Sequence, residues 1–140
     1  MYKSFEIFPI GMIRKDKNSV FVEIYDCYRD GLLKLEDFSH ILIFFWFNKR
    51  DKPEDRRVLR VHPRGNPDNP LSGVFATRSP RRPNPIAIST CKILSVEGNL
   101  VYIEDIDAFD STPVVDIKPY LKHLDPDDQI KVPTWIKKQR

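Results

Sequence analysis

The 140-residue sequence has only five glycines and two cysteines, and it lacks any long hydrophobic run. Its longest apolar run, Ile41–Phe47, is far shorter than the roughly 20 residues that span a bilayer, so no membrane segment is expected. The N-terminus has neither an uninterrupted apolar stretch nor a small-residue cleavage site, so no secretion signal is expected. Cys27 and Cys91 lie far apart without a Cys-x-x-Cys motif, which argues against a disulfide framework and favours a reducing, cytoplasmic setting.

The chain also lacks the common cofactor and nucleophile motifs. Neither G-x-G-x-x-G nor G-x-x-x-x-G-K-[ST] occurs, which excludes Rossmann and P-loop phosphate sites. The three histidines, His40, His62 and His123, show no spacing typical of metal ligands, so we expect no metal, and His40 is interpreted as a structural residue. No Gly-x-Ser-x-Gly elbow is present and neither cysteine has an activating context, so covalent catalysis is not expected.

The composition is that of one folded domain. Hydrophobic residues make up 41% of the chain and charged residues 31%, which allows a buried core and argues against disorder. Residues 1–120 contain all the predicted elements and are expected to form this domain. Residues 121–140, with Trp135, are expected to form a C-terminal tail that packs through its tryptophan and then frays.

Positive charge is concentrated in one part of the sequence. The segment Lys49–Lys92 contains eleven Lys and Arg against four acids, a net charge of +7 within a chain whose total is +3. Such a local excess suits a phosphate-bearing partner, although exposed loops of any protein are also rich in Lys and Arg. Charge alone therefore leaves nucleic-acid binding and a solvated loop as equal alternatives.

Periodicity predicts a protein built mainly from strands. Val20–Tyr25 alternates in period two, and His40–Phe47 is a continuous apolar run that predicts a central strand buried on both faces. Glu97-Gly98-Asn99 is expected to form a hairpin turn. Further strands are predicted over Val58–His62, Ser72–Thr77, Ile86–Val96, Leu100–Ile106 and Val114–Ile117.

Helices long enough to connect parallel strands are missing from the sequence. Only Asp30–Phe38, with apolar residues three positions apart, predicts a short helix of two or three turns. Parallel βαβ units need longer helices between their strands. The predicted fold class is therefore all-β, a small antiparallel barrel or sandwich of about seven or eight strands with one short helix.

The segment Gly73–Ser89, GVFATRSPRRPNPIAIS, combines three arginines with three prolines between two apolar strands. The prolines stiffen the backbone, so Arg78, Ser79 and Asn84 would present polar groups to a ligand at low entropic cost. The alternative is a rigid, solvated connector. We favour the binding interpretation because a mere connection needs neither this length nor this density of donors.

The segment Asp107–Tyr120, DAFDSTPVVDIKPY, is a second group of polar residues. Asp107, Asp110 and Asp116 surround a turn at Ser111-Thr112-Pro113, and Lys118 offers a counter-charge. An ordinary Asx turn at the end of a strand would use the same residues. Spacing alone leaves both interpretations open.

Together the two segments resemble the TsaA-like (TrmO) family of S-adenosylmethionine-dependent enzymes, which methylate N6 of threonylcarbamoyl-adenosine beside the tRNA anticodon. Phe8–Ile13 resembles the family's opening strand, Phe38-Ser39-His40 its FSH motif, and Gly73–Ser89 its signature. Asp110–Tyr120 resembles its closing element, so the resemblance covers roughly residues 5–120. It implies a dimeric β-barrel, with the cofactor bound between subunits near the arginine-proline loop.

The resemblance implies cofactor contacts, and together with the basic charge and the chemistry of methyl transfer it predicts roles for further residues. Asn84 and Asp110 are the candidates for orienting the methyl acceptor and taking its proton. The predicted S-adenosylmethionine contacts are Asn48, Lys49, Arg78, Ser79, Ile88, Asp110, Ser111, Thr112 and Pro113. The predicted tRNA contacts are Arg56, Arg57, Arg60, Arg81 and Arg82, within or close to the expected phosphate-binding surface Lys49–Arg64. No metal is implied, because methyl transfer from a sulfonium depends on alignment of the reacting atoms.

This sequence departs from the family pattern in several places. The loop containing Pro-Arg-Gln after the first strand is replaced by the short connection Arg14–Ser19. Ser111 stands where the family has a glycine, Asn48 stands where it often has histidine, and the C-terminal tRNA-binding domain of long members is not present in this sequence. Two functions therefore remain: a compact methyltransferase, which we favour because Arg78, Asn84 and Asp110 are all kept, and a non-catalytic module that binds S-adenosylmethionine or RNA.

Overall fold

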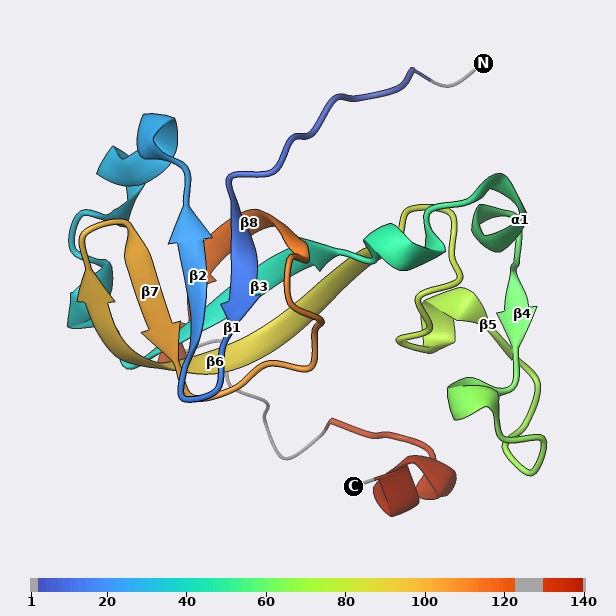
Figure 1. Ribbon diagram of the computed structural model, residues 1–140. Coiled ribbons are helices and arrows are strands. Elements are labelled where there is room, and N and C mark those ends of the chain that lie inside the picture. Colours follow the sequence, from blue (N-terminus) through green and yellow to red (C-terminus); the bar gives the residue numbers. More distant parts are fainter. Residues whose placement is uncertain (1–2, 123–129, 140) are drawn as a thin grey trace.

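The computed structural model of this protein describes residues 3–122 and 130–139. Its main body is a closed barrel whose strands follow the order β1-β2-β7-β6-β3-β8, with every neighbouring pair antiparallel (Figure 1). The barrel strands are β1 (Gly11–Lys15), β2 (Val20–Ile24), β3 (His40–Trp46), β6 (Ile86–Glu97), β7 (Leu100–Ile103) and β8 (Pro113–Pro119). The predicted antiparallel barrel is confirmed.

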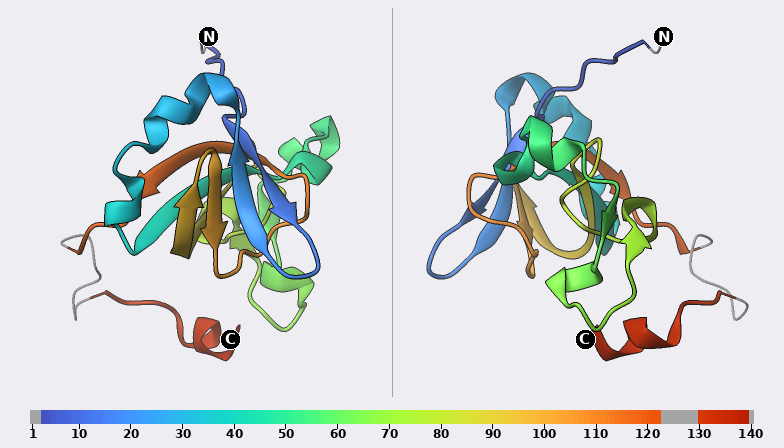
Figure 2. Two further views of the ribbon diagram at one scale, coloured as in Figure 1. Left: turned by 60° about the vertical axis from the view of Figure 1, so that its left-hand side comes forward. Right: turned by 90° about the vertical axis from the view of Figure 1, so that its right-hand side faces the viewer.

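Two further strands lie outside the barrel. β4 (Arg60–Val61) and β5 (Ser72–Gly73) pair only with each other and bring the strands of the described residues to eight. They belong to a lobe, residues 48–85, that projects from the barrel end at which β3 finishes and β6 begins (Figures 1 and 2). Both strands are shorter than predicted. Pro63 follows β4 closely and has no N–H to donate to a ladder, and β5 runs into the 3-10 helix Val74–Ala76.

The helical segments are all short. The helix predicted over Asp30–Phe38 is instead two 3-10 segments, Asp26–Leu32 and Leu35–Asp37, and Lys34 separates them with a left-handed φ of 73°. The single α-helix of the described residues, α1 (Pro53–Arg56), was not predicted. Further 3-10 segments of the described residues are Asn48–Arg50, Pro63–Gly65, Val74–Ala76 and Thr134–Gln139.

The core fills the inside of the barrel with one side-chain layer from each strand. It is made mainly of aliphatic residues that include Ile13, Val22, Ile43, Val101 and Val114, all fully buried. The prediction that His40–Phe47 is buried on both faces was wrong. Ile41, Ile43 and Phe45 point inward and are buried, whereas the alternate residues of β3 lie on the outer face and are only partly covered. A barrel is a single sheet closed on itself, so its outer face needs another layer to be buried.

Register and turns connect these strands as the sequence predicts. Gly98 and Asn99 form the turn between β6 and β7, and Gly98 adopts the positive φ of 64° that such two-residue turns favour. The side-chain amide of Asn99 also donates to the Ile24 carbonyl at 2.8 Å, which attaches the turn to β2. The predicted hairpin is confirmed.

The two ends of the chain extend away from the barrel core. Residues 3–9 run outward as an extended segment in which Phe5 is 88% exposed (Figure 1). At the other end Trp135 is half-buried, while His123 and part of the predicted tail lie outside the described residues. Across the described ranges, 3–122 and 130–139, no helix has the length and apolar character needed to cross a membrane.

Candidate functional site

Three loops that contain predicted site residues meet at one end of the barrel. Within the barrel, Trp46 pairs with Ile86 and Phe45 pairs with Val114, so the end of β3 lies beside the starts of β6 and β8. The Phe47 amide donates to the Pro85 carbonyl at 2.8 Å. This register places Asn48 and Lys49, Asn84, and Asp110–Pro113 around the same end, although they lie far apart in the sequence.

A cation–aromatic contact joins two of these loops. The Lys49 ammonium lies 4.1 Å from the centroid of the Phe109 ring, directly before Asp110. Phe109 is 66% exposed, so the pair lies at the surface, where such contacts contribute about 0.5–1 kcal/mol. Phe109 was not among the predicted site residues. A large aromatic residue placed next to a candidate acid could have indicated it.

Arg56 is the centre of a hydrogen-bond network that holds the arginine-proline loop. Its Nε donates to the Pro83 carbonyl at 2.7 Å, its Nη2 to Asn84 Oδ1 at 3.1 Å, and its Nη1 to Asp51 Oδ1 at 3.2 Å. The other carboxylate oxygen of Asp51 accepts from Trp46 Nε1 at 2.9 Å, so the network reaches β3. Arg56 was predicted to bind RNA, but all three of its nitrogens are used within the chain.

Asn84 therefore faces the surface with one of its oxygen lone pairs occupied. The side chain is exposed, and its amide N–H₂ group is not engaged by any described residue. An amide held in this way presents donors with a fixed orientation and retains one further lone pair. It can orient an acceptor base by hydrogen bonding more readily than it can accept a proton.

Arg81 and Arg82 also have partners inside the loop. Arg81 Nε donates to Asp55 Oδ1 at 3.0 Å, and Asp55 is only 6% exposed. Arg82 Nη1 donates to the carbonyls of Thr77 and Ser79 at 3.1 and 3.0 Å. These arginines fix the loop geometry, and Asp55 is a residue that the sequence analysis did not single out. Pro53 at the start of α1, followed by acids in its first turn, is the helix-start signal that could have found it.

Other arginines have no such partners. Arg57, Arg60 and Arg78 are exposed, and their side chains make no hydrogen bond or ion pair with the described residues. The loop around Arg78 is nevertheless ordered by local bonds, because the Ser79 amide donates to Thr77 Oγ1 at 3.1 Å and Ser79 Oγ accepts from the Arg81 amide at 3.1 Å. Arg78 is thus a cation on a defined backbone. No described bond connects it to Lys49 or Asp110.

The Asp110–Pro113 turn is bound to β1. Asp110 Oδ1 accepts from the Lys15 amide at 2.9 Å, and the Ser111 amide donates to the Ile13 carbonyl at 2.7 Å. Ser111 has a φ of 69°, the left-handed conformation that glycine adopts without cost, and its Oγ accepts from Arg14 Nη1 at 3.1 Å. The serine therefore keeps the backbone shape expected of a glycine here, at a cost of about 1–2 kcal/mol.

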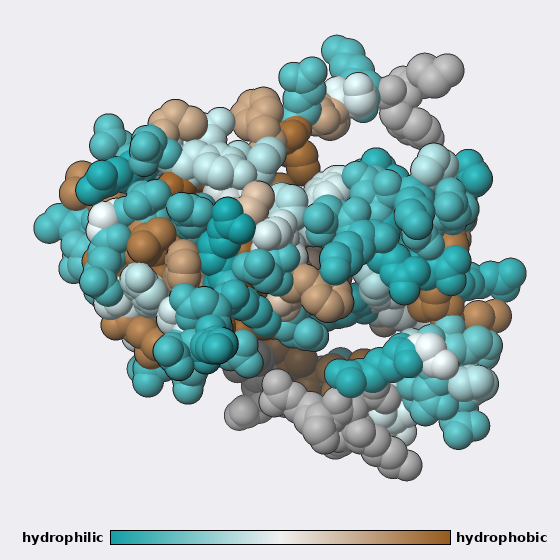
Figure 3. Space-filling view, in the orientation of Figure 1, coloured by the Kyte–Doolittle hydropathy of each residue, from teal (hydrophilic) through white to brown (hydrophobic). Residues whose placement is uncertain are grey.

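An apolar strip lies on the outer face of the barrel beside these polar groups. Ile88 is 40% exposed and Ile86 is 43% exposed, and they pair across the sheet with Phe44 and Trp46. The space-filling view shows brown residues on the barrel, whereas the lobe is mainly hydrophilic (Figure 3). Predicted Ile88 therefore offers an apolar surface rather than a core contact.

The two cysteines have contrasting surroundings. Cys27 is exposed and Cys91 is buried in the barrel core. Burial raises the pKa of the Cys91 thiol, and this effect outweighs the Ser89 hydroxyl, which would lower it. The Cys91 thiol consequently stays protonated at neutral pH. Among the described residues, no group of three or more His, Cys, Asp or Glu is placed to hold a metal ion.

Comparison with known proteins identifies the family. The sequence pattern of the tRNA-methyltransferase O N-terminal domain matches residues 1–126. The chain belongs to this family. Its relatives include a protein of Pyrococcus horikoshii named "Probable S-adenosyl-L-methionine-binding protein", which is 52% identical over 89% of this chain and 88% of its own length.

Other members of the tRNA-methyltransferase O family are longer than this chain. A mouse protein named "tRNA (adenine(37)-N6)-methyltransferase" is 39% identical over 78% of this chain, but the match spans only 25% of the mouse protein. A crystal structure of TrmO superimposes with a TM-score of 0.72 at 28% identity and covers 93% of this chain and 64% of that chain. The fold and family are thus common to short and long members.

Proposed function

We propose that this chain binds S-adenosylmethionine and transfers its methyl group to N6 of an adenosine in tRNA, with threonylcarbamoyl-adenosine next to the anticodon as the acceptor. The observation that carries this proposal is the meeting of the Lys49, Asn84 and Asp110 loops at one barrel end. Support comes from family membership and from the names of short archaeal and long mammalian relatives.

The residues at this end match the chemistry of the cofactor. Lys49 and Arg78, which bonds to no described side chain, are cations suited to a carboxylate, and Asp110 is a carboxylate suited to an ammonium group. The exposed faces of Ile86 and Ile88 can pack against an adenine ring. When bound, the cofactor supplies a methyl group on a positively charged sulfur.

The remaining task of the protein is to position the acceptor. The N6 lone pair of adenine is delocalised into the purine, so the nitrogen is a weak nucleophile and gains most from alignment. The fixed amide of Asn84 can orient the base, and Asp110 can take the proton released on transfer. Asp110 is exposed, and its Oδ1 is held by the Lys15 amide, so its position is defined before a ligand binds.

We also propose that the chain acts as a homodimer. The outer face of β6 carries Ile86 and Ile88, which are 43 and 40% exposed and pair with Trp46 and Phe44 of β3, so a second copy would bury a group of apolar side chains. Light scattering at micromolar concentration should give about twice the 16.5 kDa of one chain. A mass of 16.5 kDa would contradict the dimer.

The proposal is tested by calorimetry with the cofactor. The parent chain should bind S-adenosylmethionine, and Arg78→Ala should weaken binding by about 1.5–3 kcal/mol through the loss of a charge-assisted hydrogen bond. Arg29→Ala removes an exposed guanidinium from the 3-10 segment before β3 and should leave the affinity unchanged. Equal binding by the parent and by Arg78→Ala would show that Arg78 is not part of the site. If the parent produced no heat and no thermal shift, S-adenosylmethionine would not be its ligand.

Catalysis is tested separately from binding. Incubation of the parent with tRNA and methyl-labelled cofactor, followed by mass spectrometry of the nucleosides, should show a labelled N6-methyl adenosine derivative. The alternative function is a non-catalytic module that binds S-adenosylmethionine or RNA, which the short Arg14–Ser19 connection favours. Binding of cofactor and tRNA without any methylated nucleoside would decide for that module.

A further inference from the structure

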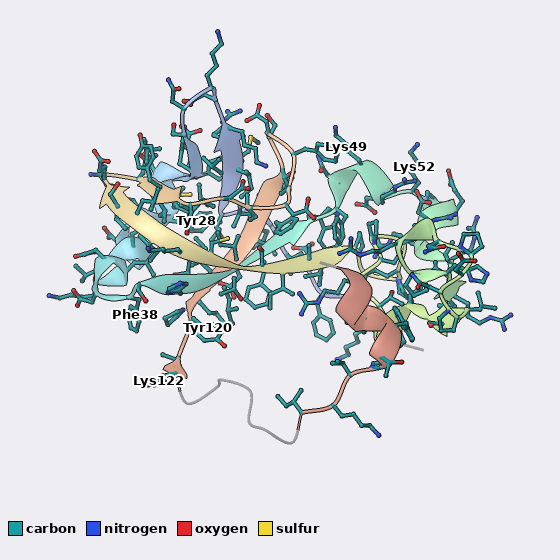
Figure 4. All side chains as sticks on the ribbon, turned by 90° about the horizontal axis from the view of Figure 1, so that it is seen from below. Tyr28, Phe38, Lys49, Lys52, Tyr120 and Lys122 are labelled. Atoms are coloured by element: carbon teal, nitrogen blue, oxygen red, sulfur yellow. The ribbon has the colours of Figure 1, made fainter. Side chains whose placement is uncertain are left out.

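An apolar groove lies beside the second half of β8. Its volume is about 560 Å³, and most of its lining is apolar, including Ile10, Ile24, Leu32, Leu35, Phe38 and Ile117. The two 3-10 segments between β2 and β3 supply one part of the lining, and β8 supplies another. Figure 4 shows Tyr28 and Phe38, which line the groove, toward the opposite end of the molecule from Lys49 and Lys52. The groove is therefore distinct from the proposed cofactor end.

The part of β8 that borders the groove has a strand on only one side. β3 pairs with β8 from Asp116 to Pro119, whereas β1 pairs with β8 only at Pro113 and Val114. Among the described residues no strand takes the other edge, and the Ile117 amide donates to Asp116 Oδ1 at 2.9 Å. An open strand edge beside an apolar groove suits an extended peptide, which can pair with the backbone and insert alternate side chains.

The segment that precedes β1 is a peptide of this kind. Residues 3–9, the N-terminal arm, are extended and run away from the barrel (Figures 1 and 2). Its large apolar side chains lie in water, because Phe5, Ile7 and Phe8 are 88, 55 and 59% exposed. Burial of these side chains is the main gain available to the arm on binding an apolar surface.

The charges of the arm complement those of the groove. Lys3 and Glu6 lie on the arm, and Asp30 and Lys34 line the groove. Neither Asp30 nor Lys34 forms an ion pair with another residue in the described ranges. Opposite charges at the edge of an apolar contact contribute mainly to specificity. The arm and the groove therefore match in charge as well as in apolar character.

The start of β1 directs the arm of the same chain away from this groove. The Ile10 amide donates to the Val114 carbonyl at 2.7 Å, and the Ile10 carbonyl accepts from the Tyr25 amide at 2.9 Å. Pro9 has a fixed φ, and a residue before proline favours extended backbone, so Phe8 continues outward. A turn centred on Pro9 would also need Ile10, which is already held in the barrel. An arm from another molecule has no such restriction.

We propose that the groove binds the N-terminal arm of a second copy of this chain, so that two copies exchange arms. Seven extended residues reach about 23 Å at about 3.3 Å per residue, which is enough to cross to a neighbouring molecule. Each copy gives one arm and receives one, the reciprocal arrangement of a two-fold dimer. The exchange goes beyond the proposed function and needs neither S-adenosylmethionine nor tRNA.

The test cross-links the arm to the native thiol of the groove. Cys27 is exposed and lines the groove, whereas Cys91 is buried in the core. Ser4→Cys adds a thiol to the arm and keeps its apolar side chains. A short thiol–thiol cross-linker should then give a product with the mass of two chains, in which peptide mapping finds the introduced thiol linked to Cys27. Lys17→Cys adds an exposed thiol in the β1–β2 turn and should give little of this product, and Cys27→Ser should abolish it.

A further variant measures the contribution of the apolar arm. Phe5→Ser in the Ser4→Cys background should lower the initial cross-linking rate about tenfold, because burial of one large apolar side chain favours binding by at least about this factor. Leu71→Ser removes a side chain of the lobe that is 53% exposed and should leave the rate unchanged.

The other outcomes contradict the proposal. A product with the mass of one chain and a link to Cys27 would place the arm in the groove of its own chain. Absence of any link to Cys27, or equal rates for Ser4→Cys and Lys17→Cys, would show that the groove is not the binding site of the arm. An unchanged rate in Phe5→Ser would show that the apolar arm does not bind there. Calorimetry with S-adenosylmethionine tests the proposed function separately, because the cross-linking requires no cofactor.

Discussion

Replacing Gly11 by alanine should lower the free energy of unfolding by about 3 kcal/mol or more. A Cβ at this position would lie 2.3 Å from the Glu23 carbonyl oxygen and 3.0 Å from the Ile24 Cα, both of them backbone atoms of β2. Backbone cannot move aside as a flexible side chain can, so β1 and β2 would have to separate. Overpacking inside a folded core typically costs 1–3 kcal/mol, and a clash with backbone lies at or above the upper limit.

The position of Gly11 in the barrel increases this effect. Gly11 pairs with Ile24 on one side and with Val114 on the other, so it lies where β1 closes the barrel between β2 and β8. The Asp110 turn is bonded to the same strand through the Lys15 amide. A displaced β1 would therefore weaken cofactor binding as well as the fold.

Gly31→Ala is the matched control for this prediction. No atom lies within 4 Å of a Cβ at Gly31, and its φ is not in the left-handed region, so the change should stay within about 1 kcal/mol. Urea unfolding followed by circular dichroism measures both variants. Equal midpoints for Gly11→Ala and Gly31→Ala would show that the strands accommodate the methyl group.

Much of the barrel could be predicted because its strands have strong periodicity. The strand predicted over Val20–Tyr25 is observed as Val20–Ile24, and the Gly98 turn followed from local sequence preferences alone. The burial of β3 was predicted wrongly, because a continuous apolar run does not reveal whether a second layer covers the outer face. Phe44 and Trp46 point outward and are nevertheless apolar, which contact with a second copy in the proposed dimer would explain.

The residue types of the site could be predicted from the sequence, but the bonding partners of its side chains could be predicted less well. The arginine-proline loop stood out by composition, but composition does not tell which arginines bond within the chain. Arg56 reaches Asn84 across 28 residues and Arg81 reaches Asp55 across 26, contacts that only the folded chain creates. Likewise, the register of β3 with β6 and β8, rather than any motif, brings Lys49 and Asp110 to the same end.

The arginines of the lobe should separate into two classes when they are replaced. Arg81→Ala should lower the free energy of unfolding by about 2–3 kcal/mol, because Asp55 is 6% exposed and would lose its ion-pair partner. Adding Asp55→Asn to Arg81→Ala should recover part of this loss, since no buried charge then remains. Arg60→Ala removes an exposed guanidinium that has no partner among the described residues, and it should change stability by no more than about 0.5 kcal/mol.

RNA binding should depend on the exposed arginines that do not bond within the described lobe. For four or five neutralised phosphates, the log affinity of the parent for tRNA should fall with log salt at a slope of about −3 to −4.5. Arg57→Glu with Arg60→Glu should flatten that slope by about 2 and leave the unfolding midpoint near that of the parent, because neither side chain bonds within the described lobe. Arg56 is left intact in this test, because its loss would disturb the Pro83–Asn84 loop and confuse a phosphate contact with a structural one. If the tRNA affinity of the parent did not change with salt, RNA would not be the ligand. An unchanged slope in the double variant would place the RNA contacts on another surface of the chain.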